Sequence, residues 1–266
     1  MHNHRPPFDE EIDVTKGMLV VLLGFAGTAA GADQAIRADQ TVEVSHLRGN
    51  VYLVEDHAYI KENSVFYVGE KSVTVVGSTW TPATARLLAA EIRKITDKPI
   101  EHVINPDYHL DRAGGNEYFK SIGASIVATA MTRELLASHW DEMVESMRKS
   151  MPAYPKSPLV LPDKTYPGDF SLQGDRVRAF YLGPAHTSDG LFVYFPEERV
   201  LYGNCILKER LGNLDSANLA EYPRTLRKLQ QLKLDFTTIV AGHWSPLHGP
   251  ELIDQYLRLL EQHGAR

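Results

Sequence analysis

Four short segments of this chain gather the residue types that bind metal ions. The first contains Asp107, His109 and Asp111 and follows a strand predicted at residues 100–105. Because these three residues alternate, an extended backbone would project their side chains to one side. A carboxylate, an imidazole and a second carboxylate are established zinc ligand types. Taken alone, however, acidic residues around a histidine in a glycine-rich turn are more typical of ordinary loop chemistry.

The other three segments each supply one candidate ligand near a strand end. His186 lies in a predicted turn between two strands, Cys205 ends a strand, and His243 follows a strand at residues 238–240. A single loop histidine means little, but four such segments together indicate a metal centre. Cys205 is the only cysteine, so it cannot form an internal disulfide. Either it is buried and inert, or a metal holds its thiolate.

The order Asp-x-His-x-Asp, His, Cys, His resembles the metallo-β-lactamases, and the surrounding sequence resembles their subclass B2. The resemblance runs from about Val42 to the C-terminus. The matching segments are Tyr108–Asn116, Val193–Pro196, Asn204–Glu209, Leu211–Asn213 and Ser245–Pro250. The resemblance implies an α/β fold, specifically a four-layer αβ/βα sandwich with the metal in a groove at one edge.

The resemblance also implies a role for each candidate residue. It assigns the working zinc to Asp111, Cys205 and His243, a second and normally empty pocket to His109 and His186, and substrate binding to Lys208 and Asn213. The residues expected at the reacting centre are His109, Asp111 and His186. Arg112 distinguishes the chain from two-metal hydrolases of the wider superfamily, which have a histidine at that position.

These roles agree with zinc chemistry. Zinc with the Asp111 carboxylate and the Cys205 thiolate is near charge neutrality, and three protein ligands leave one coordination position open. The ion can accept the negative charge of a departing lactam nitrogen. His109 is the first candidate for the general base, and Asp111 is the competing one. Lys208 offers a point charge for the carboxylate of the drug.

The sequence departs from its relatives at two positions. Asp107 stands where subclass relatives have Asn, so Asp107, His109 and His186 could hold a second zinc. Alternatively, Asp107 turns away and bonds the backbone of its own loop. Trp244 stands where a carboxylate or small polar residue is usual, and we expect it to pack beneath the groove. The short link between Val44 and Val51 leaves little room for a flexible flap, which predicts a narrow substrate range.

The hydrophobic pattern predicts two halves of similar plan. The expected strands are 41–44, 51–54, 64–68, 73–76, 100–105, 125–129, 177–182, 191–195, 200–202 and 238–240. The expected helices are 82–96, a short one opening at Gly114-Gly115, 132–149, 219–232 and one from about Pro250, with a proline-rich loop over 151–167. This order predicts two packed sheets with helices outside.

Composition and the N-terminus bear on partners and location. The net charge of −6 and a pI near 6.0 argue against nucleic-acid binding and favour a small-molecule substrate. Residues 1–32 predict a signal segment, with an apolar run over 17–30 and a small-residue cleavage site, although residues 9–13 are unusually acidic. The mature domain is then 33–266, and we expect it to be periplasmic, monomeric and without a membrane anchor.

The leading hypothesis is therefore an exported, one-zinc carbapenemase acting on a small β-lactam. One alternative is a zinc hydrolase of the same fold with a shifted substrate or with a second zinc at Asp107. Another is a zinc-binding scaffold without turnover. The joint presence of His109, Lys208 and Asn213 argues against a scaffold, which needs only the metal ligands.

Overall fold

The computed structural model describes residues 42–264, where the strands form two sheets. The predicted signal segment and its boundary with the mature domain lie outside the described residues. The first sheet has the order β1-β2-β3-β4-β5-β6-β7. Its strands are β1 (Val42–Arg48), β2 (Val51–Asp56), β3 (Glu62–Val68), β4 (Val73–Val76), β5 (Ile100–Ile104), β6 (Ser125–Thr129) and β7 (Lys164–Tyr166).

The second sheet has the order β13-β12-β11-β10-β9-β8. Its strands are β8 (Phe170–Leu172), β9 (Val177–Phe180), β10 (Phe192–Phe195), β11 (Val200–Tyr202), β12 (Thr238–Val240) and β13 (Leu247–His248). The inner faces of the two sheets share one apolar core, in which the rings of Tyr67 and Phe195 stack with centroids 6.0 Å apart.

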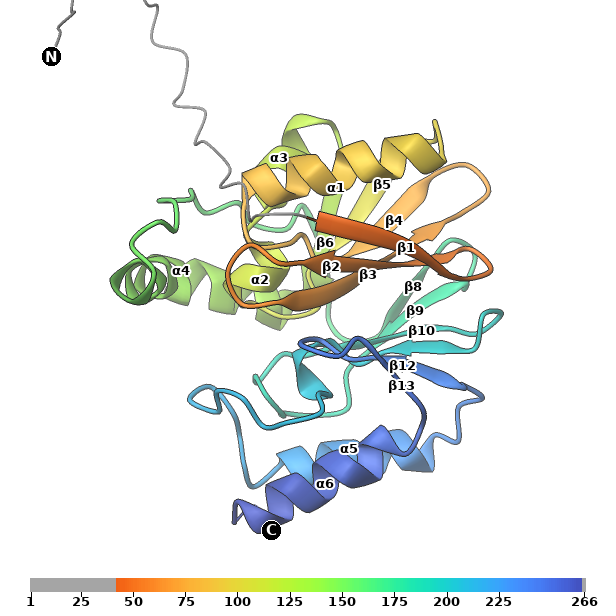
Figure 1. Cartoon of the computed structure of the whole chain (residues 1–266), viewed down its shortest axis with the longest axis vertical. Coiled ribbons are helices and arrows are strands. Elements are labelled where there is room, and N and C mark those ends of the chain that lie inside the picture. The colour runs from red at the N-terminus through yellow and green to blue at the C-terminus, as the bar shows by residue number, and fades with distance from the viewer. Residues whose placement is uncertain (1–41, 265–266) are drawn as a thin grey trace, which may run out of the picture. The chain divides into compact units, whose positions relative to one another are not determined.

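Helices cover the outer face of each sheet (Figure 1). The helices α1 (Pro82–Ile95) and α3 (Asn116–Ser121) pack on the first sheet through Leu88, Ile92 and Phe119. The helices α5 (Tyr222–Gln231) and α6 (Leu252–Gln262) pack on the second sheet. The arrangement is helix, sheet, sheet, helix, so the predicted four-layer αβ/βα sandwich is confirmed.

Local sequence signals account for most of these elements. Thr81 caps α1 by accepting a hydrogen bond from the backbone N–H of Thr84, and Pro82 occupies the first turn. The helix α4 (Ala130–Ser150) begins two residues before its predicted start, because Thr129 caps it. Its Leu136 and Trp140 are buried in a satellite core with Trp80 and Tyr154, so this face of the helix packs against the rest of the molecule.

Three short strands were not predicted. The strand β7 lies inside the segment expected to be a proline-rich loop, and it pairs in parallel with β6. The strands β8 and β13 contain three and two residues, which is too short for a period-2 pattern to register. Helix α5 begins at Tyr222 rather than at residue 219.

The link between Val44 and Val51 does not border the candidate ligands, so the prediction that its shortness limits a flap was wrong. The turn between β1 and β2 contacts Glu198, whose side chain accepts from the backbone N–H of Asn50 at 3.2 Å. Glu198 lies just before β11, whereas Cys205 follows the other end of that strand. Successive antiparallel hairpins turn at opposite ends, so the connection that borders the candidate ligands is residues 57–61, between β2 and β3. There the Lys61 carbonyl lies 3.0 Å from Nδ1 of His243.

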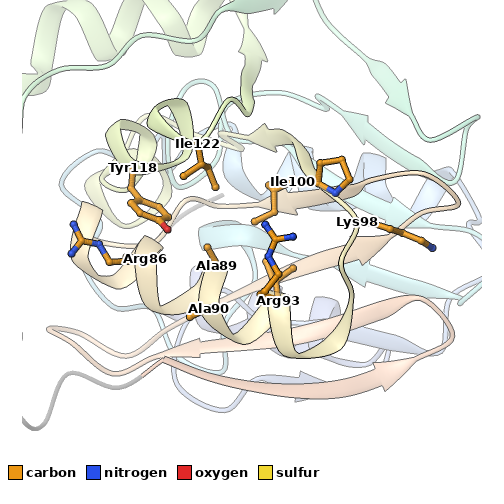
Figure 2. Close-up of a pocket in the computed structure, with 10 residues that line it drawn as sticks. Arg86, Ala89, Ala90, Arg93, Lys98, Ile100, Tyr118 and Ile122 are labelled. Carbon is orange, nitrogen blue, oxygen red and sulfur yellow. The ribbon is translucent and has the colours of Figure 1, made fainter.

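A separate pocket lies between α1 and α3, on the outer face of the first sheet (Figure 2). Arg86, Arg93 and Lys98 surround an apolar floor that includes Ile100 and Ile122. None of the predicted site residues lines it. Within residues 42–264, no helix combines the length and apolar character needed to cross a membrane.

Candidate metal centre

Three side chains from three different elements meet at one edge of the sandwich. Asp111 lies in the short helix α2 (Leu110–Ala113), Cys205 in a 3-10 turn after β11, and His243 directly after β12. The Cys205 sulfur lies 3.5 Å from both Asp111 Oδ2 and His243 Nε2. His243 Nε2 and Asp111 Oδ2 are 3.3 Å apart. These are the residues predicted to hold the working zinc.

The spacing of these three atoms fits a tetrahedral zinc ion. Ligands at about 2.0 Å for nitrogen and oxygen and about 2.3 Å for sulfur place an N–O pair about 3.3 Å apart and pairs with sulfur about 3.5 Å apart. The measured separations of 3.3, 3.5 and 3.5 Å match those values. Nδ1 of His243 faces the Lys61 carbonyl, which it can reach as a donor, leaving Nε2 free for a metal.

The backbone brings these ligands together through close strand packing. The strands β11 and β12 are parallel neighbours, so both end at the same edge of the sheet. Gly242 is required there, because a Cβ at this position would lie 2.2 Å from the Asn204 carbonyl oxygen. This close approach sets the chain after β12 directly against Cys205.

Arg112 is fully buried directly behind this cluster. Its Nε donates to the Cys205 sulfur at 3.3 Å, and its Nη2 lies 3.2 Å from Asp111 Oδ2. Nη2 also donates to the Gly242 carbonyl at 2.8 Å, and Nη1 pairs with the buried carboxylate of Glu62. The sequence reasoning used Arg112 only to exclude a two-metal site and missed Glu62. The available signal was a glutamate at the start of a strand whose C-terminal part is apolar.

The electrostatics of the cluster favour a bound cation. Burial opposes ionisation of Asp111, but Arg112 and His243 outweigh it and hold the pKa of that carboxyl well below its usual range. Burial raises the pKa of the Cys205 thiol to about 12, although Arg112 opposes the rise. The thiolate therefore needs the charge of a metal ion to form near neutral pH.

A second cluster contains His109, His186 and, again, Cys205. The two imidazole rings lie 5.2 Å apart and nearly perpendicular. Asp107 does not belong to this cluster. Its Oδ1 accepts from the backbone N–H of His109 at 2.9 Å, and its Oδ2 accepts from Asn204 at 3.0 Å. Among the described residues, the third member of this cluster is therefore Cys205 and not Asp107, which was the residue expected from the sequence.

The two predicted substrate-binding residues lie in different surroundings. Lys208 is buried, and its Nζ donates to the Cys205 carbonyl at 2.8 Å and lies 3.2 Å from His186 Nδ1. Burial lowers the pKa of Lys208 to about 8. Asn213 is exposed, and its side chain bonds with Asp215. Lys208 thus adjoins the ligands, whereas Asn213 lies on the loop beyond them.

Trp244 packs against that same loop. The guanidinium of Arg210 lies 4.2 Å from the centre of its ring, and Gly212 approaches the ring so closely that a Cβ would lie 2.8 Å from it. Trp244 is partly buried and adopts a positive φ of 60°. The tryptophan therefore packs against residues 210–212, which directly precede Asn213 in the same loop.

Comparison with known proteins places this geometry in a family. The sequence model of the metallo-beta-lactamase superfamily matches residues 60–243. A metallo-beta-lactamase type 2 from Elizabethkingia meningoseptica is 28% identical over 256 residues, covering 91% of this chain and 95% of that protein.

Solved structures show the same fold. A metallo-beta-lactamase from Pontibacter korlensis superposes with a TM-score of 0.72 at 22% identity, covering 83% of this chain and 99% of the other. The FIM-1 enzyme from Pseudomonas aeruginosa, in its mono-zinc form, gives a TM-score of 0.72 at 18% identity and covers 85% and 97%. The family implies a bound metal ion, for which the residues described above offer a fitting donor set. The chain belongs to the metallo-beta-lactamase superfamily and is an enzyme of this hydrolase family.

Proposed function

We propose that this enzyme hydrolyses the β-lactam ring of carbapenems with one working zinc ion, as a member of subclass B2. The observation that supports this most directly is the set of 3.3, 3.5 and 3.5 Å separations among Asp111, Cys205 and His243. Zinc bound there would act as a Lewis acid on the negative charge that develops on the departing lactam nitrogen.

His109 is the general base in this proposal. The residue is partly exposed, and the Asp107 carboxylate accepts a hydrogen bond from its backbone N–H. Burial lowers the pKa of His109, but the Cys205 sulfur and Asp107 outweigh this effect and raise it overall. Asp111, the competing candidate, has a pKa held far below the usual range, which makes it a weak base.

The contact between Lys208 and His186 supports a single zinc. A lysine ammonium has only donors, so His186 Nδ1 must accept, and the ring proton of the neutral imidazole then lies on Nε2. That proton and the adjacent positive charge both oppose a cation in the second pocket. The pocket can therefore remain without a metal while the ligands of the working zinc are complete.

Replacing Cys205 by Ser tests the proposed ligand set. Because Cys205 supplies one of the two anionic ligands, we expect zinc affinity to fall by a factor of about 100 or more and carbapenem hydrolysis to be abolished. The measurements are metal content after dialysis and turnover of a carbapenem, with exposed His46→Ala as the control variant. Normal zinc content and turnover in the Ser variant would rule out this ligand set.

The substrate range requires its own measurement. We expect a carbapenem to be cleaved and a penicillin and a cephalosporin to be nearly untouched. Because the turn between β1 and β2 lies away from the candidate ligands, this expectation depends only on the resemblance to subclass B2. Comparable turnover numbers for all three drug classes would show that the chain has the fold without the subclass specificity.

A hydrolase with a shifted substrate is the second candidate. The engaged ammonium of Lys208 favours it, because a substrate carboxylate could bind there only after the contacts with Cys205 and His186 are exchanged. A zinc-loaded protein that cleaves none of the three drugs but hydrolyses another ester or amide would support this candidate. A zinc-loaded protein without any turnover would be the scaffold.

For localisation, we propose export to the periplasm with cleavage after Ala32, and a monomeric mature protein. Expression in a bacterial host followed by N-terminal sequencing of the periplasmic fraction tests this directly. A mature protein that begins at Asp33 and has the mass of a monomer in light scattering is the expected result. Retention of residues 1–32 on the purified protein would contradict it.

A further inference from the structure

We propose that Glu62 is a positioning residue for the metal centre: its carboxylate fixes the Arg112 guanidinium so that this cation faces both Cys205 and Asp111. The inference rests on the proposed ligand set and goes beyond it, because Glu62 lies outside that set. Both Glu62 and Arg112 are fully buried. They come from different elements, since Glu62 opens β3 and Arg112 lies in α2.

Each nitrogen of the Arg112 guanidinium has a partner in the observed orientation. Nη1 pairs with Glu62 Oε2 and also donates to the Asn63 carbonyl at 3.2 Å. With Nη1 held on that side, Nε faces the Cys205 sulfur, and Nη2 reaches both Asp111 and Gly242. Since the fork of five donors is rigid, fixing one nitrogen sets the direction of the others. Glu62 is thus the contact that aims the fork at the metal ligands.

The charges of this buried set balance only with Glu62 present. A buried guanidinium needs a paired anion. When a divalent ion binds, the negative charges of Asp111 and Cys205 are directed to the metal. Arg112 would then keep an uncompensated positive charge directly behind a cation. Burial raises the pKa of Glu62 to about 8, although Arg112 opposes the rise. When ionised, Glu62 supplies the missing negative charge, so that the three anions, the guanidinium and the divalent ion together are neutral.

Glu62 is also tied to the third ligand through the backbone. Glu62 and His243 form an isolated antiparallel β-bridge, and the N–H of Asn63 donates to the Gly242 carbonyl at 2.9 Å. Ser64 Oγ donates to the same carboxylate oxygen that Arg112 contacts, at 2.9 Å. Glu62 is therefore linked to all three proposed ligands: to Cys205 and Asp111 through Arg112, and to His243 through the β-bridge.

The test compares Glu62→Gln with the wild-type protein. The amide has the same shape but no charge. We expect zinc affinity, measured by chelator competition, to fall about 10- to 100-fold. In the cobalt-substituted protein, we expect a changed thiolate-to-cobalt charge-transfer band, because the donor to the Cys205 sulfur is no longer fixed. A folded Gln variant with wild-type affinity and band would overturn the proposal.

Glu55→Gln is the matched control. Glu55 lies on the neighbouring strand β2 and pairs with Lys61. The substitution therefore removes a carboxylate from the same hairpin but leaves the contacts of Arg112 unchanged. Its zinc affinity and cobalt spectrum should equal those of the wild type. An equal loss in the control variant would show that the effect is general to the hairpin and would overturn the role assigned to Glu62.

Glu62→Asp is the second variant, to be measured if the Gln variant does not fold. Aspartate keeps the charge but is one methylene shorter, so we expect a folded protein with weaker zinc binding and an altered cobalt band. Wild-type values for both would overturn the proposal. A wild-type protein without any thiolate-to-cobalt band would instead refute the ligand set itself. A wild-type band without carbapenem turnover would refute only the proposed substrate.

Discussion

At the scale of single residues, Lys208 can serve two roles that the same substitution separates. As a substrate anchor it contributes mainly to ground-state binding, so Lys208→Ala should raise KM several-fold and lower kcat less. As the neighbour of His186 it repels a second cation. Its removal should then let the second pocket bind zinc more tightly.

Steady-state kinetics on a carbapenem and zinc stoichiometry at excess metal distinguish the two roles. An unchanged KM together with an increased zinc content would assign Lys208 to the metal pocket alone. The exposed Lys233→Ala serves as the control, because it removes a lysine that follows α5.

Asp107 has a side chain that could bind zinc, but its contacts predict a role in stability instead. Both carboxylate oxygens are already used, one by the His109 backbone and one by Asn204. In Asp107→Asn the amide can satisfy only one of these donors. We expect the free energy of unfolding to fall by about 1–3 kcal/mol, with an unchanged zinc titration. A weaker second zinc in the Asn variant would show that the carboxylate turns to the metal after all.

At the scale of elements, the connection over residues 57–61 is anchored by the buried carboxylate of Asp56. It accepts from the backbone N–H of Ala58 at 2.9 Å. Burial raises the pKa of Asp56 to about 6, and the backbone bonds oppose this only in part. Since the folded state binds this proton more tightly than the unfolded chain does, the contribution of Asp56 to stability is largest at low pH. It is lost as pH rises from about 4 to about 6.

Asp56→Asn tests this sign. Relative to the wild type, the Asn variant should gain about 3 kcal/mol in the free energy of unfolding between pH 4 and pH 7, as an upper value. Urea unfolding at a series of pH values gives the difference between the two proteins directly. A difference that does not change with pH would mean that Asp56 keeps an ordinary pKa in the folded protein.

At the scale of the whole molecule, the metal centre joins the two halves of the sandwich. Asp111 follows β5 of the first sheet, and Cys205 and His243 follow β11 and β12 of the second. A ligand that binds only the folded state stabilises it by about 4 kcal/mol when its free concentration is 1,000 times its Kd.

Removal of zinc should therefore lower the melting temperature by roughly 10 °C for a domain of this size. Calorimetry with and without a chelator measures the shift, and re-addition of zinc should reverse it. Equal melting temperatures for both forms would argue that the sheets need no metal between them. The Cys205→Ser variant should show a much smaller shift, because it binds the ion at least about 100-fold more weakly.

The sequence by itself determined most of the elements and the set of candidate ligands. Thr81-Pro82 starts a helix, and alternating apolar residues define most strands, because these signals act over a few neighbouring residues. The positions after strands indicated six candidate ligands, and the resemblance to the metallo-β-lactamases then selected Asp111, Cys205 and His243 among them. The family resemblance then supplied the order of the layers.

Only the tertiary structure decided which partners each side chain finds. Asp107 and His109 are two residues apart and were assigned together, yet only His109 reaches the cluster, because Asn204 captures the Asp107 carboxylate from 97 residues away. The pairing of Arg112 with Glu62 joins residues 50 apart. Such contacts depend on how two sheets pack and which hairpins turn at the same end. A local sequence pattern does not contain that information.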